Sequence, residues 1–159
     1  YNRDQDKNKN QFNAEDNSYL MEQGDKNLLQ HLNDGLEISF EEKLKITSDV
    51  LAGMAYAHKN SIIHRDLHLG NILKIRNDFV ICDFGLSKDL SIERSMKSSY
   101  TEKNNHLFVD PLAVSDFRKL DIKSDIYSIG KIIDYIFTFK EATYDHMFKT
   151  IVERATSRN

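Results

Sequence analysis

Two polar motifs, separated by two short apolar runs, constrain this chain of 159 residues more than any other feature. The first is His64–Asn71, which reads His-Arg-Asp-Leu-His-Leu-Gly-Asn, and the second is Asp83–Gly85, which reads Asp-Phe-Gly. The apolar runs Ile72–Ile75 and Phe79–Cys82 predict the strands of a small β-hairpin, because a short polar segment separates them. Such a hairpin would fix the distance between the end of the first motif and the start of the second.

In their residues, order and separation, the two motifs resemble the catalytic loop and the metal-binding triplet of eukaryotic-type protein kinases. The resemblance implies that Asp66 orients the attacking hydroxyl and finally accepts its proton. It also implies that Asn71 and Asp83 hold Mg²⁺ (or Mn²⁺) on the phosphates of ATP, since magnesium prefers hard oxygen ligands. Glycine tolerates positive φ, so we expect Gly85 to turn the backbone sharply after the metal ligand. A surface turn with a few polar residues is the alternative interpretation.

The resemblance gives further residues of these motifs auxiliary roles. Arg65 would pair with a phosphate group placed on the segment after the second motif and so order that segment. His68 stands where serine/threonine kinases usually have Lys, and a protonated His68 would contact the γ-phosphate. Because an unperturbed His is mostly neutral at pH 7, a His that packs or bonds locally is the alternative. The residues that would support the structure of the site are His64, Phe84, Gly85 and Asp125.

The stretch Leu20–Gly24 resembles the hinge that joins the two kinase lobes. The resemblance implies that Met21, Glu22 and Gln23 meet the adenine of ATP and that Leu73 lies under its ring. A plain strand, turn and helix is the alternative. The leucines that follow at helical spacing and predict a short helix are Leu28, Leu29 and Leu32.

Ser39 and Glu42 form the pattern of a capping box, which predicts a helix that begins after Ser39 and runs to about Lys59. Asn60 is a typical residue at a helix C-terminus. Residues that recur at steps of three and four predict one broad buried face along this helix. The face comprises Phe40, Leu44, Thr47, Leu51, Met54 and His58, with Val50 and Ala57 beside them.

Residues 124–130, which read Ser-Asp-Ile-Tyr-Ser-Ile-Gly, resemble the start of the large central helix of the kinase C-lobe. The resemblance implies that Asp125 accepts hydrogen bonds from the backbone of the catalytic loop. An ordinary core helix with an Asp near its N-terminus is the alternative. The apolar residues predicted to be buried on this helix are Ile126, Ile129, Ile132, Ile133, Ile136 and Phe137. A last amphipathic helix would bury Met147, Phe148, Ile151, Val152 and Ala155.

Residues 86–107 show no apolar period and are rich in hydroxyl side chains, Lys and Arg. In the family this is the activation segment, and an unmodified hydroxyl-rich loop is the alternative. Leu112 stands where the family usually has a Glu after its Pro, so we expect a less rigid end of the segment. The candidate phosphorylation sites are Ser98, Ser99, Tyr100 and Thr101.

The composition limits the partners and the compartment. A net charge of −3 offers no basic field for nucleic acid or for an anionic membrane. No apolar run is long enough to span a bilayer, and no charged-then-apolar leader is visible. The single cysteine, Cys82, excludes an internal disulfide, so we expect a small buried thiol in a cytoplasmic protein. The chain starts at Tyr1 rather than Met, which is compatible with a fragment.

These patterns predict an α+β, mainly α fold with two regions. Residues 1–18 are rich in Asn, Asp and Lys and predict a polar loop or a disordered tail. Residues 19–159 resemble a protein-kinase-like C-lobe, from the hinge to a late helix, with a shortened C-terminus. We find no Gly-rich phosphate loop, no strand-borne Lys and no Glu to pair with it. We therefore expect an N-lobe that is absent or truncated here, or that is supplied upstream or in trans.

Three functions are compatible with these patterns, and we prefer the first. It is a protein kinase that transfers the γ-phosphate of ATP to a Ser/Thr or Tyr hydroxyl of a protein substrate. A chain without the phosphate loop and its Lys would transfer phosphate slowly or not at all, because those groups stabilise charge. The second is a non-catalytic kinase-like interaction module (a pseudokinase). The third is a small-molecule phosphotransferase of the aminoglycoside type, which also uses an Asp and an Asn at this spacing.

Overall fold

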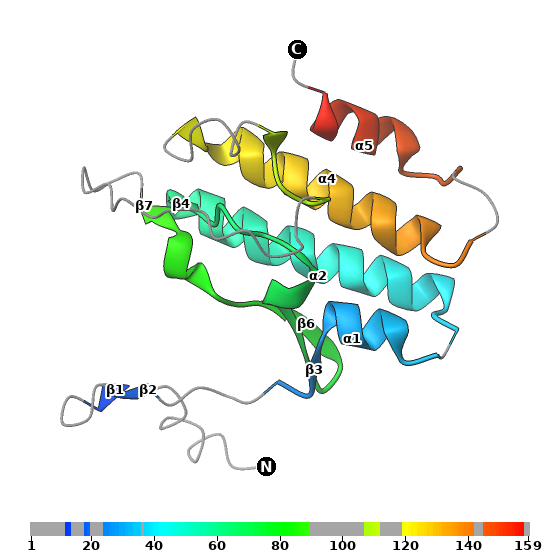
Figure 1. The fold of residues 1–159 in the computed structure, drawn as a ribbon, viewed down its shortest axis with the longest axis horizontal. Helices are drawn as coiled ribbons and strands as arrows, with labels where there is room; N and C mark the ends of the chain where they lie inside the picture. The colour runs from blue at the N-terminus through cyan, green and yellow to red at the C-terminus, as the bar shows by residue number, and fades with distance from the viewer. Residues whose placement is uncertain are drawn as a thin grey trace.

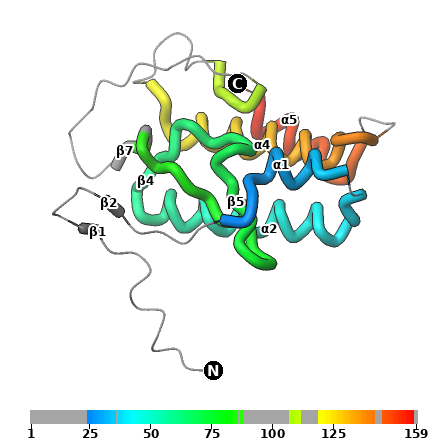
Figure 2. The backbone as a smooth tube through the Cα atoms, turned by 60° about the horizontal axis from the view of Figure 1, so that its bottom comes forward, coloured from blue at the N-terminus to red at the C-terminus, as the bar shows by residue number. Residues whose placement is uncertain are grey.

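The computed structural model describes residues 12–13, 18–19, 24–35, 37–89, 107–111, 119–141 and 145–157. Two long helices, α2 (Phe40–Lys59) and α4 (Ile122–Thr138), lie side by side, and α5 (Lys149–Thr156) packs on α4 (Figure 1). The hairpin that joins the two polar motifs contacts α2 (Figure 2). The hairpin and the two motifs at its ends therefore pack against the helical part of the fold. Within the described ranges, none of the helices combines the length and the apolar character needed to cross a bilayer.

The short helix α1 (Leu28–Asn33) is present where the leucine spacing predicts it. Its N-terminus is a complete capping box. The Asn27 side chain accepts a hydrogen bond from the Gln30 backbone N–H at 2.9 Å, and the Gln30 side chain accepts one from the Asn27 N–H at 3.0 Å. Two of the three leucines are buried in the core, whereas Leu29 is exposed.

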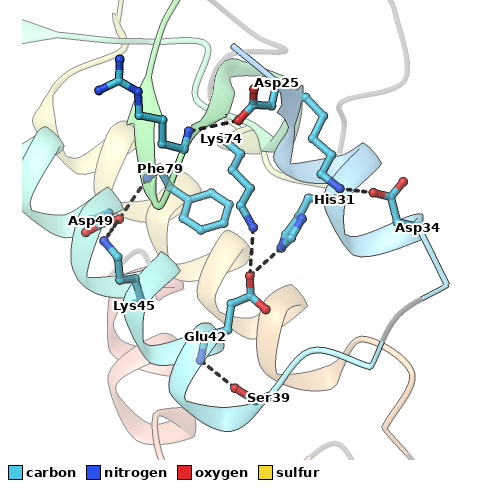
Figure 3. A network of polar contacts seen from close by, with 11 residues as sticks. Asp25, His31, Asp34, Ser39, Glu42, Lys45, Asp49, Lys74 and Phe79 are labelled. Carbon is cyan, nitrogen blue, oxygen red and sulfur yellow. Dashed lines mark hydrogen bonds and ion pairs between the residues drawn. The ribbon is translucent and has the colours of Figure 1, made fainter.

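α2 begins and ends as predicted, but its capping box is only half formed. The Ser39 hydroxyl accepts a hydrogen bond from the Glu42 backbone N–H at 3.2 Å, and Asn60 is the C-cap. The Glu42 carboxylate instead accepts hydrogen bonds from His31 Nε2 at 2.8 Å and Lys74 Nζ at 3.3 Å (Figure 3). Burial raises the pKa of Glu42, but these two donors lower it by more, so the pKa lies below its ordinary value.

The contacts of Glu42 belong to a polar network that joins α1, α2 and the hairpin (Figure 3). Asp49, on α2, accepts hydrogen bonds from Lys45 Nζ at 2.7 Å and from the Phe79 backbone N–H at 3.0 Å. The Phe79 ring centroid lies 5.4 Å from that of His31 and 5.5 Å from Lys74 Nζ. Polar and aromatic contacts thus fix the hairpin against the helices at the end away from the two motifs.

The buried face of α2 includes Thr47, Val50, Met54 and Ala57 as predicted, but it is shifted around the helix axis from the rest of the predicted face. Phe40 is 50% exposed and Leu51 is 45% exposed, although the periodicity predicts both to be buried. Successive residues advance by about 100° around a helix, so Leu51 lies well away from the buried Val50. Packing against α4 and the hairpin selects the neighbouring stripe. The buried residues of α2 are Lys43, Ile46, Thr47, Val50, Met54 and Ala57.

The predicted hairpin is confirmed. β5 (Ile72–Ile75) pairs antiparallel with β6 (Asp78–Ile81), with a turn at residues 76–77 in which Arg76 has φ 57°. The turn is therefore shorter than predicted, because residue 78 already belongs to β6. β3 (Lys26–Asn27), which the sequence does not predict, pairs with the other edge of β5 and gives the order β3-β5-β6.

Two further strand pairs lie in the described residues. β4 (Ile62–Ile63) precedes the first motif and pairs antiparallel with β7 (Lys88–Asp89), which follows the second. β1 (Phe12–Asn13) pairs with β2 (Ser18–Tyr19), so the region predicted as a polar tail contains a short strand pair. The other residues of that region, and residues 20–23, lie outside the described part of the chain.

α4 is the predicted central helix, and Asp121 is its N-cap. The other predicted apolar residues of α4 are buried, but Ile126 is 40% exposed, which corrects the prediction for this residue. α5 approaches α4 closely at Gly130, where a Cβ atom would come within 2.9 Å of the Ala155 Cβ atom. The predicted apolar face of α5 is only partly buried, because the exposed residues include Met147 and Ile151.

Candidate active site

The first polar motif is anchored by Asp125, in the first turn of α4. Its carboxylate is 1% exposed and accepts hydrogen bonds from the backbone N–H groups of His64 at 2.8 Å and Arg65 at 2.9 Å. These are the contacts that the resemblance implies. Arg65 has φ 69°, which residues other than glycine adopt rarely, so the buried acceptor stabilises an unusual backbone conformation.

His58 is a third donor to Asp125 that the sequence patterns do not reveal. Its Nε2 atom lies 2.8 Å from the Asp125 carboxylate. The helical period indicates only that His58 faces the core or its edge, and no local signal shows which group it meets. A buried carboxylate needs such donors, because an unpaired charge is costly away from water.

His64 links the two motifs to each other. The Asp66 backbone N–H donates to His64 Nδ1 at 3.3 Å, so the ring proton is on Nε2, which lies 3.0 Å from the Cys82 carbonyl oxygen. The His64 ring is fully buried, and its centroid lies 4.6 Å from that of Phe84. His64 and Phe84 therefore pack the catalytic loop against the Asp-Phe-Gly triplet.

The base of the hairpin brings Asn71 next to the start of the second motif. The Cys82 backbone N–H donates to the Asn71 carbonyl oxygen at 2.9 Å, which continues the β5–β6 pairing by one step. The Asn71 side-chain Nδ2 donates to the Asp66 carbonyl oxygen at 2.9 Å. This donation orients the amide of Asn71 and leaves its Oδ1 atom as an acceptor or a ligand.

The sharp turn at the second motif is made by Asp83 rather than by Gly85, contrary to the prediction. Asp83 has φ 59° and ψ 66°, in the left-handed region that Asp tolerates better than most residues. Gly85 does not have a positive φ. Its backbone N–H donates to Asp83 Oδ1 at 3.2 Å, and a Cβ atom at Gly85 would lie 3.0 Å from that oxygen. Glycine thus provides room for the carboxylate.

Asp66 and His68 are half-buried neighbours at the centre of the catalytic loop. Asp66 Oδ2 lies 3.9 Å from His68 Nε2. Burial raises the pKa of Asp66, and the imidazoles of His68 and His64 offset only part of this effect. Burial lowers the pKa of His68, and the Asp66 carboxylate offsets only part of that effect. Burial thus favours the uncharged form of each of these two side chains.

Leu73 is the one candidate adenine contact that falls within the described residues. It is half-buried in β5, opposite Asn27 of β3. A Cβ atom at Gly24 would lie 3.1 Å from Leu73, so the chain passes close to Leu73 just before α1. The candidates that lie outside the described residues are Met21, Glu22, Gln23, Ser98, Ser99, Tyr100, Thr101 and Leu112.

Asn71 and Asp83 carry the oxygen ligand types that a magnesium ion prefers. Protein sites commonly hold Mg²⁺ through one or two carboxylates together with substrate phosphates and waters. Asn71 would offer its amide oxygen and Asp83 its carboxylate, which also accepts the Gly85 N–H. In the part of the chain that the structure describes, no group of three or more His, Cys, Asp and Glu side chains is placed to hold a metal ion.

A mainly helical lobe with a catalytic-type loop, a hairpin and an Asp-Phe-Gly turn is the architecture that the motifs predict. The family model for the protein kinase domain matches residues 7–158. This chain therefore belongs to the protein kinase family. Because the match begins at residue 7, the prediction that an N-lobe is absent is not confirmed. Neither this match nor the curated relatives support an N-lobe that is supplied in trans.

Curated relatives include kinases of both acceptor classes. A probable serine/threonine-protein kinase of Encephalitozoon cuniculi is 37% identical over 136 residues, which cover 82% of this chain and 24% of the relative. The calcium/calmodulin-regulated receptor-like kinase 2 of Arabidopsis thaliana is 37% identical over 119 residues, or 72% of this chain and 26% of the relative. The tyrosine-protein kinase Src64B of Drosophila melanogaster is 33% identical over 72% of this chain and 20% of its own length. The chain thus spans about a quarter or less of these relatives.

Proposed function

We propose that this chain transfers the γ-phosphate of ATP to a protein hydroxyl, with Asp66 as the catalytic base and with Asn71 and Asp83 as the ligands of Mg²⁺. The observation that carries the proposal is the hydrogen bond at the base of the hairpin, from the Cys82 N–H to the Asn71 carbonyl at 2.9 Å. This pairing holds the two candidate ligands at the same end of the hairpin. The match to the protein kinase domain supports the same reaction class.

Each of the three side chains has a distinct part in the proposed reaction. A bound Mg²⁺ ion would neutralise the charge that develops on the transferred phosphoryl group. Asp66 orients the acceptor hydroxyl and takes its proton, and the raised pKa that burial causes makes it a stronger base. Asn71, one of the two proposed metal ligands, also contacts the residue of the base, because its Nδ2 atom donates to the Asp66 backbone carbonyl. Nucleotide binding would add Met21, Glu22, Gln23 and Leu73 around the adenine.

We propose a Ser or Thr hydroxyl as the acceptor, with Tyr as the second choice. Relatives that are named serine/threonine kinases and one that is named a tyrosine kinase have similar identity to this chain, so both acceptors need a test. We also propose that a phosphate on Ser98, Ser99, Tyr100 or Thr101 pairs with the buried Arg65 and orders the activation segment. Phosphoamino-acid analysis of the labelled product identifies the acceptor.

The proposal is tested by phosphate transfer from γ-labelled Mg-ATP to the chain itself and to a generic protein substrate. The variants are Asp66→Asn and Asp83→Asn. Asp145→Asn is the matched control, because this exposed carboxylate is remote from the motifs and lies 3.6 Å from Lys149. Transfer that is lost in both site variants and kept in the control supports the proposal, even if the parent rate is low. Transfer that survives in the site variants contradicts the assignment of Asp66 and Asp83. No transfer by the parent contradicts activity of this chain alone and leaves an interaction module or a kinase that lacks its phosphate loop and Lys.

A further inference from the structure

The His68 side chain caps the turn that carries Asn71. The Gly70 backbone N–H donates to His68 Nδ1 at 3.0 Å, and the Asn71 backbone N–H donates to the His68 carbonyl oxygen at 3.0 Å. These two hydrogen bonds close the 3₁₀ turn η2 (Leu69–Asn71), of which His68 is the N-cap. The position of Asn71 therefore depends on the imidazole ring as well as on the hairpin.

The same hydrogen bond determines which nitrogen of His68 carries the proton. A backbone N–H can only donate, so Nδ1 accepts and the proton of the neutral ring is on Nε2. The Nε2 atom lies 3.9 Å from Asp66 Oδ2. The ring thus places an N–H group beside the candidate base, and a proton on Nδ1 would break the cap.

Position 70 needs a glycine because a side chain has no room there, and not because of the backbone conformation. Its φ is not in the left-handed region, so a residue with a side chain would not be strained for that reason. A Cβ atom at Gly70, however, would lie 2.8 Å from His68 Cε1 and 3.0 Å from His68 Nδ1. These are atoms of a ring that is already fixed by its hydrogen bond, so the ring would have to leave the cap.

We propose that His68 and Gly70 are a coupled positioning pair: the ring caps the turn that holds Asn71 in place for the metal, and the cap keeps the Nε2 atom 3.9 Å from Asp66 Oδ2. The pair replaces the permanent cation that the kinase resemblance implies at position 68. The inference rests on the proposed function, because it takes Asn71 as a ligand of the metal and Asp66 as the base. The proton position and the affinity for Mg-ATP are measured without any transfer.

The test is a double-mutant cycle with His68→Ala, Gly70→Ala and the double variant, with His68→Asn as a separating variant. Asn is a preferred N-cap residue and can accept the Gly70 N–H, but it places no donor at the Nε2 position. The readouts are the ¹⁵N NMR signals of the His68 ring, the affinity for Mg-ATP and the transfer rate. If Gly70 acts independently of His68, the losses of affinity in the two single variants add up in the double variant. If the two residues are coupled, the losses do not add.

We expect the parent ring to be unprotonated at Nδ1 and protonated at Nε2. Gly70→Ala and His68→Ala should each weaken Mg-ATP affinity by about tenfold, and the double variant by no more than His68→Ala alone. His68→Asn should keep the affinity and lower only the transfer rate. The double variant also removes the clash, so it should fold even if Gly70→Ala does not.

A proton on Nδ1, or additive losses in the double variant, would overturn the inference. A parent that binds Mg-ATP but transfers no phosphate contradicts the proposed kinase activity, and the cycle in affinity still decides the positioning role. A parent that does not bind Mg-ATP contradicts the positioning of Asn71 for a metal.

Discussion

Replacement of Asp125 by Asn tests whether α4 anchors the catalytic loop. The carboxylate accepts three hydrogen bonds: Oδ2 accepts from the His64 N–H and His58 Nε2, and Oδ1 accepts from the Arg65 N–H. Asn has a single acceptor oxygen. If that oxygen takes the Oδ2 position, the variant keeps two hydrogen bonds and directs an NH₂ group at the Arg65 N–H.

The expected loss follows from these contacts. A hydrogen bond to a charged group contributes about 1.5–3 kcal/mol, and a buried donor left without a partner costs about 1–3 kcal/mol. Because both estimates describe the same lost contact, we expect the free energy of unfolding to fall by about 3 kcal/mol. Urea unfolding of the parent and of Asp125→Asn, followed by circular dichroism, measures the difference.

The matched control is Asp134→Asn on the same helix. The Asp134 side chain is 43% exposed and has His146 Nε2 as a partner at 3.1 Å. Asn keeps an acceptor oxygen for His146 Nε2, and a typical hydrogen bond contributes only about 0.5–1.5 kcal/mol, so we expect a smaller loss than for Asp125→Asn. Equal and small losses for the two variants would refute the argument that Asp125 is the anchor of the loop.

Three more predictions concern close contacts and pH. Gly130→Ala should lower the free energy of unfolding by about 1–3 kcal/mol, because the new methyl group would overlap α5. The control is Gly53→Ala, whose methyl group would meet only the flexible end of one side chain on β6. It should change the free energy of unfolding less, and urea unfolding measures both variants. Gly85→Ala should weaken Mg-ATP binding, measured by calorimetry, because its Cβ atom would press on the Asp83 carboxylate, and unchanged affinity would contradict this. The pKa of Glu42 is lower in the folded state, so its stabilising contribution is present above the ordinary pKa of 4.5 and is lost as the pH falls through the folded value. Glu42→Gln should therefore lower the free energy of unfolding near neutral pH and lose less of it than the parent does as the pH falls. Urea unfolding at several pH values measures both proteins, and a constant difference between them would argue against this role of Glu42.

Local patterns predicted the elements whose determinants lie close together in the sequence. The hairpin from Ile72 to Ile81 follows from two apolar runs and a polar turn, and the start of α2 follows from the Ser39 cap. The contact between Asp125 and the loop backbone spans about sixty residues, but a motif identified it. The resemblance therefore predicted a long-range contact that periodicity alone does not reveal.

Contacts between distant segments account for what the sequence did not predict. The buried stripe of α2 is set by packing, and it includes Lys43, whose partner is Glu141. Glu42 leaves its expected capping role because His31 and Lys74 offer stronger, charged or polar partners. The left-handed conformation of Asp83 could not be read from a triplet whose glycine is the usual residue for that conformation.

The central claim is that Asp66 and Asp83 lie in one site but have different tasks. Calorimetric titration of ATP in the presence and absence of Mg²⁺, on the parent, Asp66→Asn and Asp83→Asn, tests this claim most directly. We predict that Mg²⁺ strengthens ATP binding to the parent and to Asp66→Asn, and that Asp83→Asn loses this dependence. If Mg²⁺ has the same effect on all three proteins, or none on the parent, the assignment of Asp83 as a metal ligand is contradicted; loss of the dependence in Asp66→Asn as well would contradict the separate tasks.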